Sequence, residues 1–508
     1  MVKLQNNGIA EGIGNQGEAD CPGKASKIGP STVFELCRER LSPFGGLLGF
    51  IKFLDLAKFQ EIFDGFYTPP SREPKQGHYF MLVGLVMLLF IGFNRVWHFV
   101  YIQFDSMMCS IFNMLKLPNV STYWRYMNSL GLNQGQSLLT VMSALRERVW
   151  HLCEINYESV HIDIDTTVET IFGNQQGGRK GHNTKNRGKK AFRPVLCFME
   201  ETREYLCGKL RTGKTMGGEE TAALIRTFRK YLPACVTEVT LRGDGEFIGW
   251  ESVKAAMTEG FHYIFGNKAC HPPFDPAKWY KARKEETVEY NECLYKPMGW
   301  EQICRFVAMR IPKEELCSAG PVQLELLEDT KYKYRIFVTS LPQKTHKVIK
   351  EYDKRADAEN LIGEAKQEGL EAIPSSKFAS NYAYFQIVML AYNIWRSFKM
   401  LAGHGLKEEA QAEKDADDKS HESASLQGIA ENKIRIARLK LLFIAAKVSG
   451  HGNTYKVKYS QHDSRVAGLF GFMEYLDKRR SQARPWLDGK RWLSKHLQAL
   501  RIKRMAPS

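Results

Sequence analysis

The chain has 508 residues, of which 44% are hydrophobic and 25% are charged, and this ordinary globular balance provides core for roughly three domains. Lys and Arg number 72 against 56 Asp and Glu, so the net charge is +16, which favours a polyanionic partner. The 11 cysteines include no Cys-x-x-Cys pair, which excludes a zinc ribbon or a disulfide framework and indicates a reduced intracellular protein.

Neither secretion nor membrane insertion is expected. Residues 1–31 are polar and Gly-rich, contain no apolar segment of a signal sequence, and are predicted to be disordered. Residues 79–93 form an apolar run that is shorter than the roughly 20 residues of a spanning helix. We therefore predict a buried core helix there and no membrane partner.

Residues 32–156 have an all-helical pattern and are predicted to form a DNA-binding region. Two predicted helices, 106–117 and 123–128, are separated by Pro118-Asn119-Val120, and the second exposes Arg125. This is the pattern of a helix-turn-helix that reads a DNA groove, although any helical hairpin gives the same pattern.

From residue 157 to 267 the pattern changes to alternating strands and helices. Val160, Ile162 and Ile164 lie on one side of the first strand, and polar residues lie on the other. The later strands are predicted at 194–200, 205–210, 236–241 and 261–267, with helices at 218–231 and 250–258. Hairpin strands followed by strand–helix–strand is the order of an RNase H-like α/β core.

The remaining segments complete the predicted domain organisation. Residues 268–340 are expected to form a mostly β insertion, and residues 341–402 the second part of the core, ending in an apolar helix. Residues 403–428 are highly charged and predict a mobile loop, and residues 429–508 form a basic C-terminal region.

Three carboxylates lie where a metal site could form. Asp165 lies near the end of the first predicted strand and Asp244 at the end of the fourth, and Glu359 lies on a predicted helix at 352–366. Three carboxylates suffice to hold two Mg²⁺ ions about 4 Å apart, the arrangement that neutralises the attacking and leaving oxygens of a phosphodiester. Asp163 shares the strand face of Asp165 and is the alternative ligand.

The polar face of the predicted helix supports this interpretation. At about 100° per residue, Tyr352, Arg355, Glu359 and Lys366 fall within an arc of roughly 60°. A carboxylate between two cations and a phenol suits a metal ion that lies beside phosphates.

The spacing Tyr-x2-Arg-x3-Glu-x6-Lys resembles the YREK signature of DDE transposases of the insertion-sequence-4 superfamily, and the wider sequence is most similar to the insertion-sequence-1380 family. The contexts Asp165-Thr166 and Arg242-Gly243-Asp244 match the first two acidic positions of that family. The resemblance implies that Asp165, Asp244 and Glu359 are catalytic and bind Mg²⁺, for which Mn²⁺ can substitute. It also implies that Tyr352, Arg355 and Lys366 hold DNA phosphates.

The same resemblance implies a cut-and-paste transposase. Such an enzyme binds the inverted-repeat ends of an insertion sequence, cleaves the strands through hairpin ends, and joins them to target DNA as a homodimer. A bacterial cytoplasmic protein associated with the nucleoid is expected. The alternatives are a catalytically silent DNA-binding regulator derived from a transposase and a non-transposing RNase H-like nuclease.

Residues 173–190 form a basic loop that could clamp the DNA backbone or be a solvated hairpin tip. Its cations are Arg179, Lys180, Lys185, Arg187, Lys189 and Lys190. Trp279 and Trp300 of the insertion either stack on an unpaired base, as the resemblance implies, or pack in the core.

Residues 208–215 fit the pattern GxxxxGK[ST] of a phosphate-binding loop. That loop requires a helix to begin at once after the Lys-Thr pair, whereas Met216-Gly217-Gly218 follows here. A hairpin strand with its turn is the simpler interpretation, and no nucleotide cofactor is expected.

Overall fold

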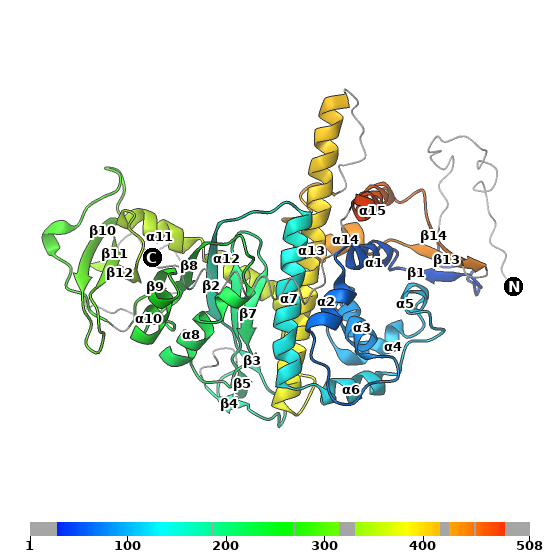
Figure 1. Ribbon diagram of the computed structural model, residues 1–508, viewed down its shortest axis with the longest axis horizontal. Helices are drawn as coiled ribbons and strands as arrows, with labels where there is room; N and C mark the ends of the chain where they lie inside the picture. The colour runs from blue at the N-terminus through cyan, green and yellow to red at the C-terminus, as the bar shows by residue number, and fades with distance from the viewer. Residues whose placement is uncertain are drawn as a thin grey trace. The chain divides into compact units, whose positions relative to one another are not determined.

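The computed structural model describes residues 28–181, 183, 186–268, 270–313, 331–416, 426–451 and 454–482. The chain divides into two compact units (Figure 1). Unit 1 comprises Met1–Leu56, Phe99–Asn119 and Ala402–Gln482, and unit 2 comprises Ala57–His98, Val120–Leu401 and Ala483–Ser508.

Unit 2 is built on an eight-stranded mixed sheet in the order β10-β11-β12-β9-β8-β2-β6-β7. The strands are β2 (Ser159–Thr166), β6 (Val195–Met199), β7 (Tyr205–Lys209), β8 (Glu238–Gly243), β9 (His262–Gly266), β10 (Glu289–Tyr295), β11 (Cys304–Pro312) and β12 (Tyr332–Thr339). The β2–β8 and β8–β9 pairs are parallel and the other pairs antiparallel. A mixed α/β fold is therefore confirmed, whereas its RNase H-like character remains a prediction.

The central strand β2 follows the predicted alternation. Val160, Ile162 and Ile164 are fully buried, which secures the register of β2 in the sheet. In the parallel pair with β8, Ile164 lies opposite Gly243, so both strands end at the same edge of the sheet.

Helices complete unit 2, and α12 lies against β2 and β6 (Figure 1). They are α2 (Phe59–Phe66), α3 (His78–Phe90), η1 (Val96–His98), α6 (Val120–Ser129), α7 (Leu132–Leu152), α8 (Gly218–Ile225), α9 (Phe228–Tyr231), α10 (Trp250–Thr258), η2 (Pro276–Lys278), α11 (Thr345–Asp353), α12 (Ala356–Ala365), η4 (Lys366–Leu370) and α13 (Phe378–Ala416), whose residues up to Leu401 belong to this unit. The predicted core helix is α3, in which every residue from Met81 to Phe90 is buried. Across the described ranges, no helix is long and apolar enough to cross a membrane.

The single helix predicted for residues 352–366 is wrong. The chain instead forms α11, a short junction at Lys354 and Arg355, and α12, and then continues as the π-helix η4. At the junction the Arg355 and Ala358 amides donate to carbonyls only three residues earlier, both at 2.9 Å. These tighter bonds interrupt the α-helix although the backbone angles stay helical, so helical periodicity could not reveal the break.

Unit 1 contains a three-stranded antiparallel sheet in the order β1-β13-β14. Its elements are β1 (Arg40–Ser42), α1 (Leu47–Leu56), α4 (Phe99–Ile102), α5 (Ser106–Ile111), α14 (Ile434–Leu441), β13 (Ala446–His451), β14 (Thr454–Tyr459) and α15 (Arg465–Gln482). The expectation of an all-helical region at 32–156 is therefore corrected, because β1 pairs with β13 about 400 residues later. A partner so distant leaves no local sequence signal.

Two further helical predictions differ from the structure. The helix expected at 106–117 ends at Ile111, and Asn113 then adopts a left-handed φ of 51°. The loop expected at 403–428 is helical as far as Ala416, because this charged segment is rich in the strong helix formers Ala, Glu and Lys. Residues 1–27, 417–425 and 483–508, which include parts of other predicted segments, lie outside the described residues.

The segment that resembles a phosphate-binding loop is the end of β7 and its turn. Arg211 holds the turn by donating to the carbonyls of Lys214 and Thr215 and by pairing with Glu220. The next helix, α8, begins at Gly218, so no helix N-terminus follows the Lys-Thr pair directly.

Candidate active site

Two of the predicted carboxylates lie at neighbouring strand ends. Asp165 is the penultimate residue of β2, and Asp244 directly follows β8. Because Ile164 lies opposite Gly243 in this parallel pair, the next residues of the two strands are Asp165 and Asp244. Adjacent strands are about 4.8 Å apart, which brings the two side chains to one edge of the sheet.

The two aspartates are held in the same way. Oδ1 of Asp165 accepts a hydrogen bond from the Thr166 amide at 2.8 Å, and Oδ1 of Asp244 accepts one from the Glu246 amide at 2.9 Å. Oδ2 of Asp165 lies 3.3 Å from the Arg355 guanidinium, and Oδ2 of Asp244 lies 3.7 Å from the Lys268 ammonium. Each carboxylate thus has one oxygen fixed by backbone and one oxygen facing a cation.

The third carboxylate comes from α12. Arg355 is the N-cap residue of this helix and donates to the Ile164 carbonyl at 3.2 Å, which ties the start of α12 to the end of β2. Glu359 follows one turn later and is exposed.

The electrostatics of Asp165 connect it with the other two carboxylates. Burial raises the pKa of Asp165 to about 6, Arg355 opposes this shift, and the negative charges of Asp244 and Glu359 add to it. A carboxylate that is desolvated beside two others is stabilised by a cation. The donor set is all oxygen, which fits Mg²⁺ or Mn²⁺.

A second acidic cluster lies on the same sheet. Within the described residues, the three ligand atoms that lie mutually within 4.8 Å belong to His161, Glu200 and Glu201, and not to the predicted three carboxylates.

The His161 cluster already has internal partners. The imidazole Nδ1 lies 2.8 Å from Glu201, and Nε2 lies 3.2 Å from Glu351 on α11. Glu200 lies 2.8 Å from the Arg242 guanidinium. With both imidazole nitrogens and Glu200 engaged, this cluster joins β2, β8 and α11 rather than offering free ligands.

Asp163, the alternative ligand, is occupied by an ion pair. Its two oxygens accept from Arg242 at 2.7 and 2.8 Å, and both side chains are buried. Arg242 also donates to the Glu351 carbonyl at 2.9 Å, which fixes α11 against the sheet. Both oxygens of Asp163 are thus engaged by Arg242, whereas Oδ2 of Asp165 faces Arg355 at 3.3 Å, and the choice of Asp165 as ligand stays a prediction.

Sequence reasoning missed four residues beside the carboxylates. The Thr166 hydroxyl donates to Glu246 at 3.2 Å, and Arg193 forms an ion pair with the same carboxylate. Lys268 is the fourth, beside Asp244. Glu246 could have been noticed from its position two residues after Asp244, but Arg193 lies between β5 and β6 and Lys268 follows β9, so neither carries a local signal.

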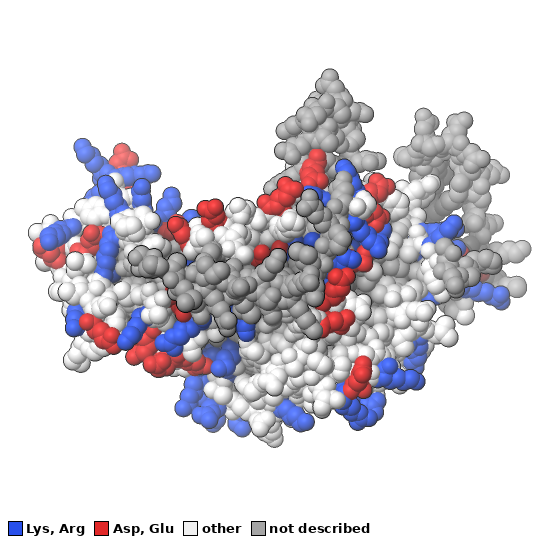
Figure 2. All heavy atoms as spheres, viewed as in Figure 1, with Lys and Arg blue, Asp and Glu red and all other residues white. Residues whose placement is uncertain are grey.

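The predicted basic loop forms a small sheet beside the main one. Its strands are β3 (Glu169–Thr170), β5 (Lys190–Phe192) and β4 (Arg179–Lys180), in that order. Figure 2 shows basic side chains gathered over β4 and β5. The exposed cations of this segment are Arg179, Lys180, Arg187, Lys189 and Lys190, and Lys185 lies outside the described residues. Arg125 is likewise exposed on α6, with its guanidinium 3.4 Å from the Thr122 hydroxyl.

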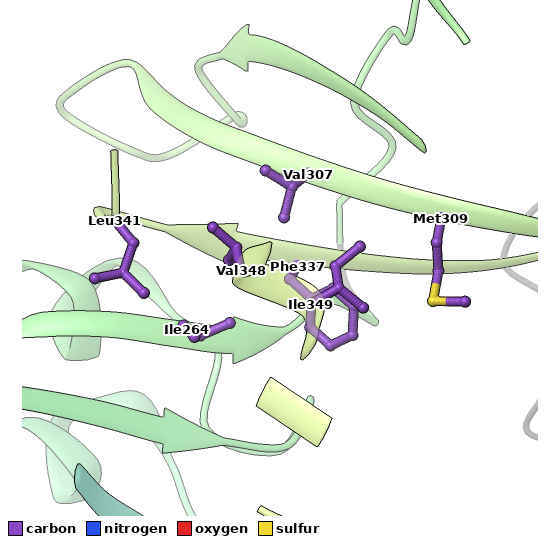
Figure 3. Close-up of a cluster of buried hydrophobic side chains, with 7 residues drawn as sticks. All are labelled: Ile264, Val307, Met309, Phe337, Leu341, Val348 and Ile349. Carbon is purple, nitrogen blue, oxygen red and sulfur yellow. The ribbon is translucent and has the colours of Figure 1, made fainter. Parts of the chain in front are cut away.

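Tyr352 is anchored by the core beneath the β10–β12 strands. The buried cluster there comprises Ile264, Val307, Met309, Phe337, Leu341, Val348 and Ile349 (Figure 3). The Tyr352 ring packs against this cluster with its centroid 4.5 Å from that of Phe337. A Cβ at Gly266 would lie 3.5 Å from the Tyr352 hydroxyl and 3.5 Å from the Asp244 carbonyl carbon, so the phenol points toward the carboxylate site.

Lys366, the last residue of the predicted signature, lies beside acidic residues other than the three predicted ligands. Its ammonium lies 3.9 Å from Glu371. Burial raises the pKa of Glu169 to about 8, and the charge of Lys366 acts in the opposite direction. These contacts place Lys366 beside Glu169 and Glu371, so its contact with DNA stays a prediction.

The two tryptophans of the insertion differ. Trp300 is buried, with its ring 5.7 Å from Trp250 and 6.0 Å from Phe306, so it belongs to the core. The Trp279 ring has the Arg310 guanidinium 4.3 Å from its centroid and the Tyr334 ring 5.7 Å away.

Comparison with known proteins identifies the family. The family model "Transposase DDE domain group 1" matches residues 39–416, which is more than half of the chain. No curated protein matches. Among solved structures, the chain is similar to a piggyBac transposase in a cryo-EM synaptic complex with hairpin DNA, with 11% identity and a TM-score of 0.40 over 90% of this chain and 84% of that one. By the family match, the chain belongs to the transposase DDE domain group 1 family and is a DDE transposase.

Proposed function

We propose that this transposase binds the inverted-repeat ends of an insertion sequence of the insertion-sequence-1380 family, cleaves the strands, and transfers them to target DNA. The observation that supports the proposal is that Asp165 and Asp244 end neighbouring parallel strands, and that the charges of Asp244 and of Glu359 on α12 both act on Asp165. A cut-and-paste route through hairpin ends is the finer form of this proposal and rests on the resemblance of the YREK spacing.

Asp165, Asp244 and Glu359 would hold the divalent ions. When bound, Mg²⁺ neutralises charge on the attacking and leaving oxygens of the phosphodiester. The backbone of the chain orients the aspartate ligands. The Thr166 and Glu246 amides fix one oxygen of each aspartate, so little reorganisation is needed on binding.

The surrounding cations would hold the DNA. Arg355 is buried beside Asp165 and can donate to a phosphate oxygen in place of that carboxylate once an ion occupies the site. Tyr352 and Lys366 are proposed to hold neighbouring phosphates, as the signature implies.

The exposed cations of β4, β5 and their turn provide a surface for the DNA backbone, and Arg125 on α6 is proposed to add a further contact. Binding of two DNA ends by a homodimer is part of the proposal, because two ends must be joined to one target.

The test uses the purified full chain, Mg²⁺ and a duplex carrying the inverted repeats that flank the coding region. We expect cleaved ends and joined strand-transfer products from the wild type. Glu359→Gln should reduce cleavage by several orders of magnitude, because it removes one of three ligands. Asp357→Asn is the matched control on the same helix, where the carboxylate pairs with Arg203 at 2.9 Å, and should cleave like the wild type.

The outcomes separate the alternatives. Cleavage without joined products indicates a nuclease, and a mobility shift without cleavage in either Mg²⁺ or Mn²⁺ indicates a regulator. Cleavage by Glu359→Gln at the wild-type rate contradicts the proposed ligand set.

A further inference from the structure

Lys268 lies just after β9, and its side chain extends to the candidate active site at the ends of β2 and β8. Its ammonium lies 3.7 Å from Oδ2 of Asp244, the oxygen that the backbone amide of Glu246 does not contact. Each aspartate therefore faces one cation, and the predicted signature accounts for Arg355 but not for Lys268.

The absence of a side chain at Gly245 leaves room for the Lys268 side chain. A Cβ placed on Gly245 would lie 2.5 Å from Cγ, 2.7 Å from Cδ and 3.0 Å from Cε of Lys268. The lysine stem thus occupies the space that a side chain at residue 245 would need. A glycine directly after Asp244 lets the ammonium lie over the aspartate.

Lys268 and Arg355 are held very differently. The Arg355 side chain is 10% exposed and is anchored by the Ile164 carbonyl as well as by Asp165. The Lys268 side chain is 47% exposed and pairs with Asp244, which is itself 33% exposed. A half-exposed pair at this distance is weak, so the ammonium can leave Asp244 with little loss of stability.

We propose that Lys268 is a substrate-contacting residue that exchanges partners during the reaction. Without metal and DNA, its ammonium neutralises Asp244. Asp244 would release the ammonium if it held a divalent ion, and the ammonium would then turn on its flexible stem to a non-bridging oxygen of the DNA phosphate at the cut. A compact ammonium with rotatable donors suits such an exchange better than a rigid guanidinium. This inference rests on the proposed function.

The first experiment compares Lys268→Ala with the wild type in two measurements. Without DNA, the variant should bind Mn²⁺ at least as tightly as the wild type, because a competing positive charge is gone. With the inverted-repeat duplex and Mg²⁺, its cleavage rate should fall at least tenfold. Log affinity for DNA decreases linearly with log salt, and this decrease should become shallower by about 0.9, the value for one lost phosphate contact.

Lys278→Ala is the matched control, because Lys278 also lies 3.7 Å from an aspartate, Asp275, but on the exposed helix η2. It should change none of these measurements. Weaker Mn²⁺ binding by Lys268→Ala would overturn the inference, since Lys268 would then support the metal site itself. Unchanged cleavage would overturn it as well.

Gly245→Ala provides a second test without removing the charge. The added methyl should displace the flexible lysine stem and lower cleavage in the same direction as Lys268→Ala. The double variant should then cleave no more slowly than Lys268→Ala alone, and additive losses would contradict the proposed exchange. If the wild type itself fails to cleave, the proposed function fails, and the Mn²⁺ comparison still tests whether Lys268 competes for Asp244.

Discussion

At the residue scale, the charged form of Asp165 lowers the free energy of unfolding. Asp165 is largely buried, and burial together with two carboxylate neighbours raises its pKa to about 6 despite the nearby Arg355. The folded protein therefore binds a proton at Asp165 more readily than the unfolded chain does, whose aspartates have a pKa of about 4. Between these two pH values the free energy of unfolding falls as pH rises, and above about pH 6 the loss is complete.

Asp165→Asn should therefore raise the melting temperature of the metal-free protein at about pH 7 to 8, where the wild-type carboxylate is charged. The gain should shrink toward about pH 4, where the wild-type carboxyl is protonated. Added Mn²⁺ should raise the melting temperature of the wild type and have little effect on the variant. Asp357→Asn, which changes a partly buried carboxylate on α12 outside the proposed ligand set, is the control. A variant less stable than the wild type at neutral pH would show that the ion pair with Arg355 outweighs the repulsion.

Residue patterns predicted part of this site. The alternation in β2 placed Asp163 and Asp165 on one face, and the structure then separates them by their partners, since Arg242 occupies both oxygens of Asp163. The pattern of a single strand could not distinguish the two, because Arg242 lies 79 residues later on β8. The contacts of Arg193 and Lys268 with the site could not be predicted for the same reason, because contacts between residues far apart in the sequence leave no local pattern.

At the element scale, the α11–α12–η4 segment determines where the Arg355 and Glu359 side chains lie. The sequence predicted one continuous helix, and the structure divides it at residues 354–355 and again where η4 begins. Gly369 lies within η4 with φ 114°, a conformation that other residues rarely adopt. A Cβ there would also lie 3.0 Å from Leu89 Cδ2, so the backbone favours glycine and the Leu89 side chain would have to shift slightly for any other residue.

Two glycine substitutions in this segment should have opposite effects. Gly369→Ala should lower the free energy of unfolding by about 1–3 kcal/mol, because alanine at this φ is strained. Gly363 lies inside α12, and no atom lies within 4 Å of the position that an alanine methyl would take there. Gly363→Ala should therefore raise stability by about 0.5–1 kcal/mol. Urea denaturation of both variants measures the difference, and equal stabilities would contradict the assigned backbone conformation of Gly369.

At the scale of the whole molecule, composition and periodicity predicted the class of fold but not its connections. The mixed α/β class agrees with the sequence, whereas β10, β11 and β12, which lie between β9 and α11, continue the main sheet. The β1 strand could not be foreseen, because three residues near the N-terminus pair with β13 from the C-terminal region. The net charge of +16 and the exposed cations of β4 and β5 are consistent with a DNA-binding transposase.

The central claim is that the divalent ions bind at Asp165, Asp244 and Glu359, and iron-directed cleavage of the protein tests it most directly. Fe²⁺ replaces Mg²⁺, and ascorbate with peroxide then cuts the backbone close to the bound ion. We predict cuts close to residues 165, 244 and 359, which are lost in Asp244→Asn and suppressed by excess Mg²⁺. Cuts close to Glu200 and Glu201, with none near Asp244 and Glu359, would place the ion at the His161 cluster and contradict the account.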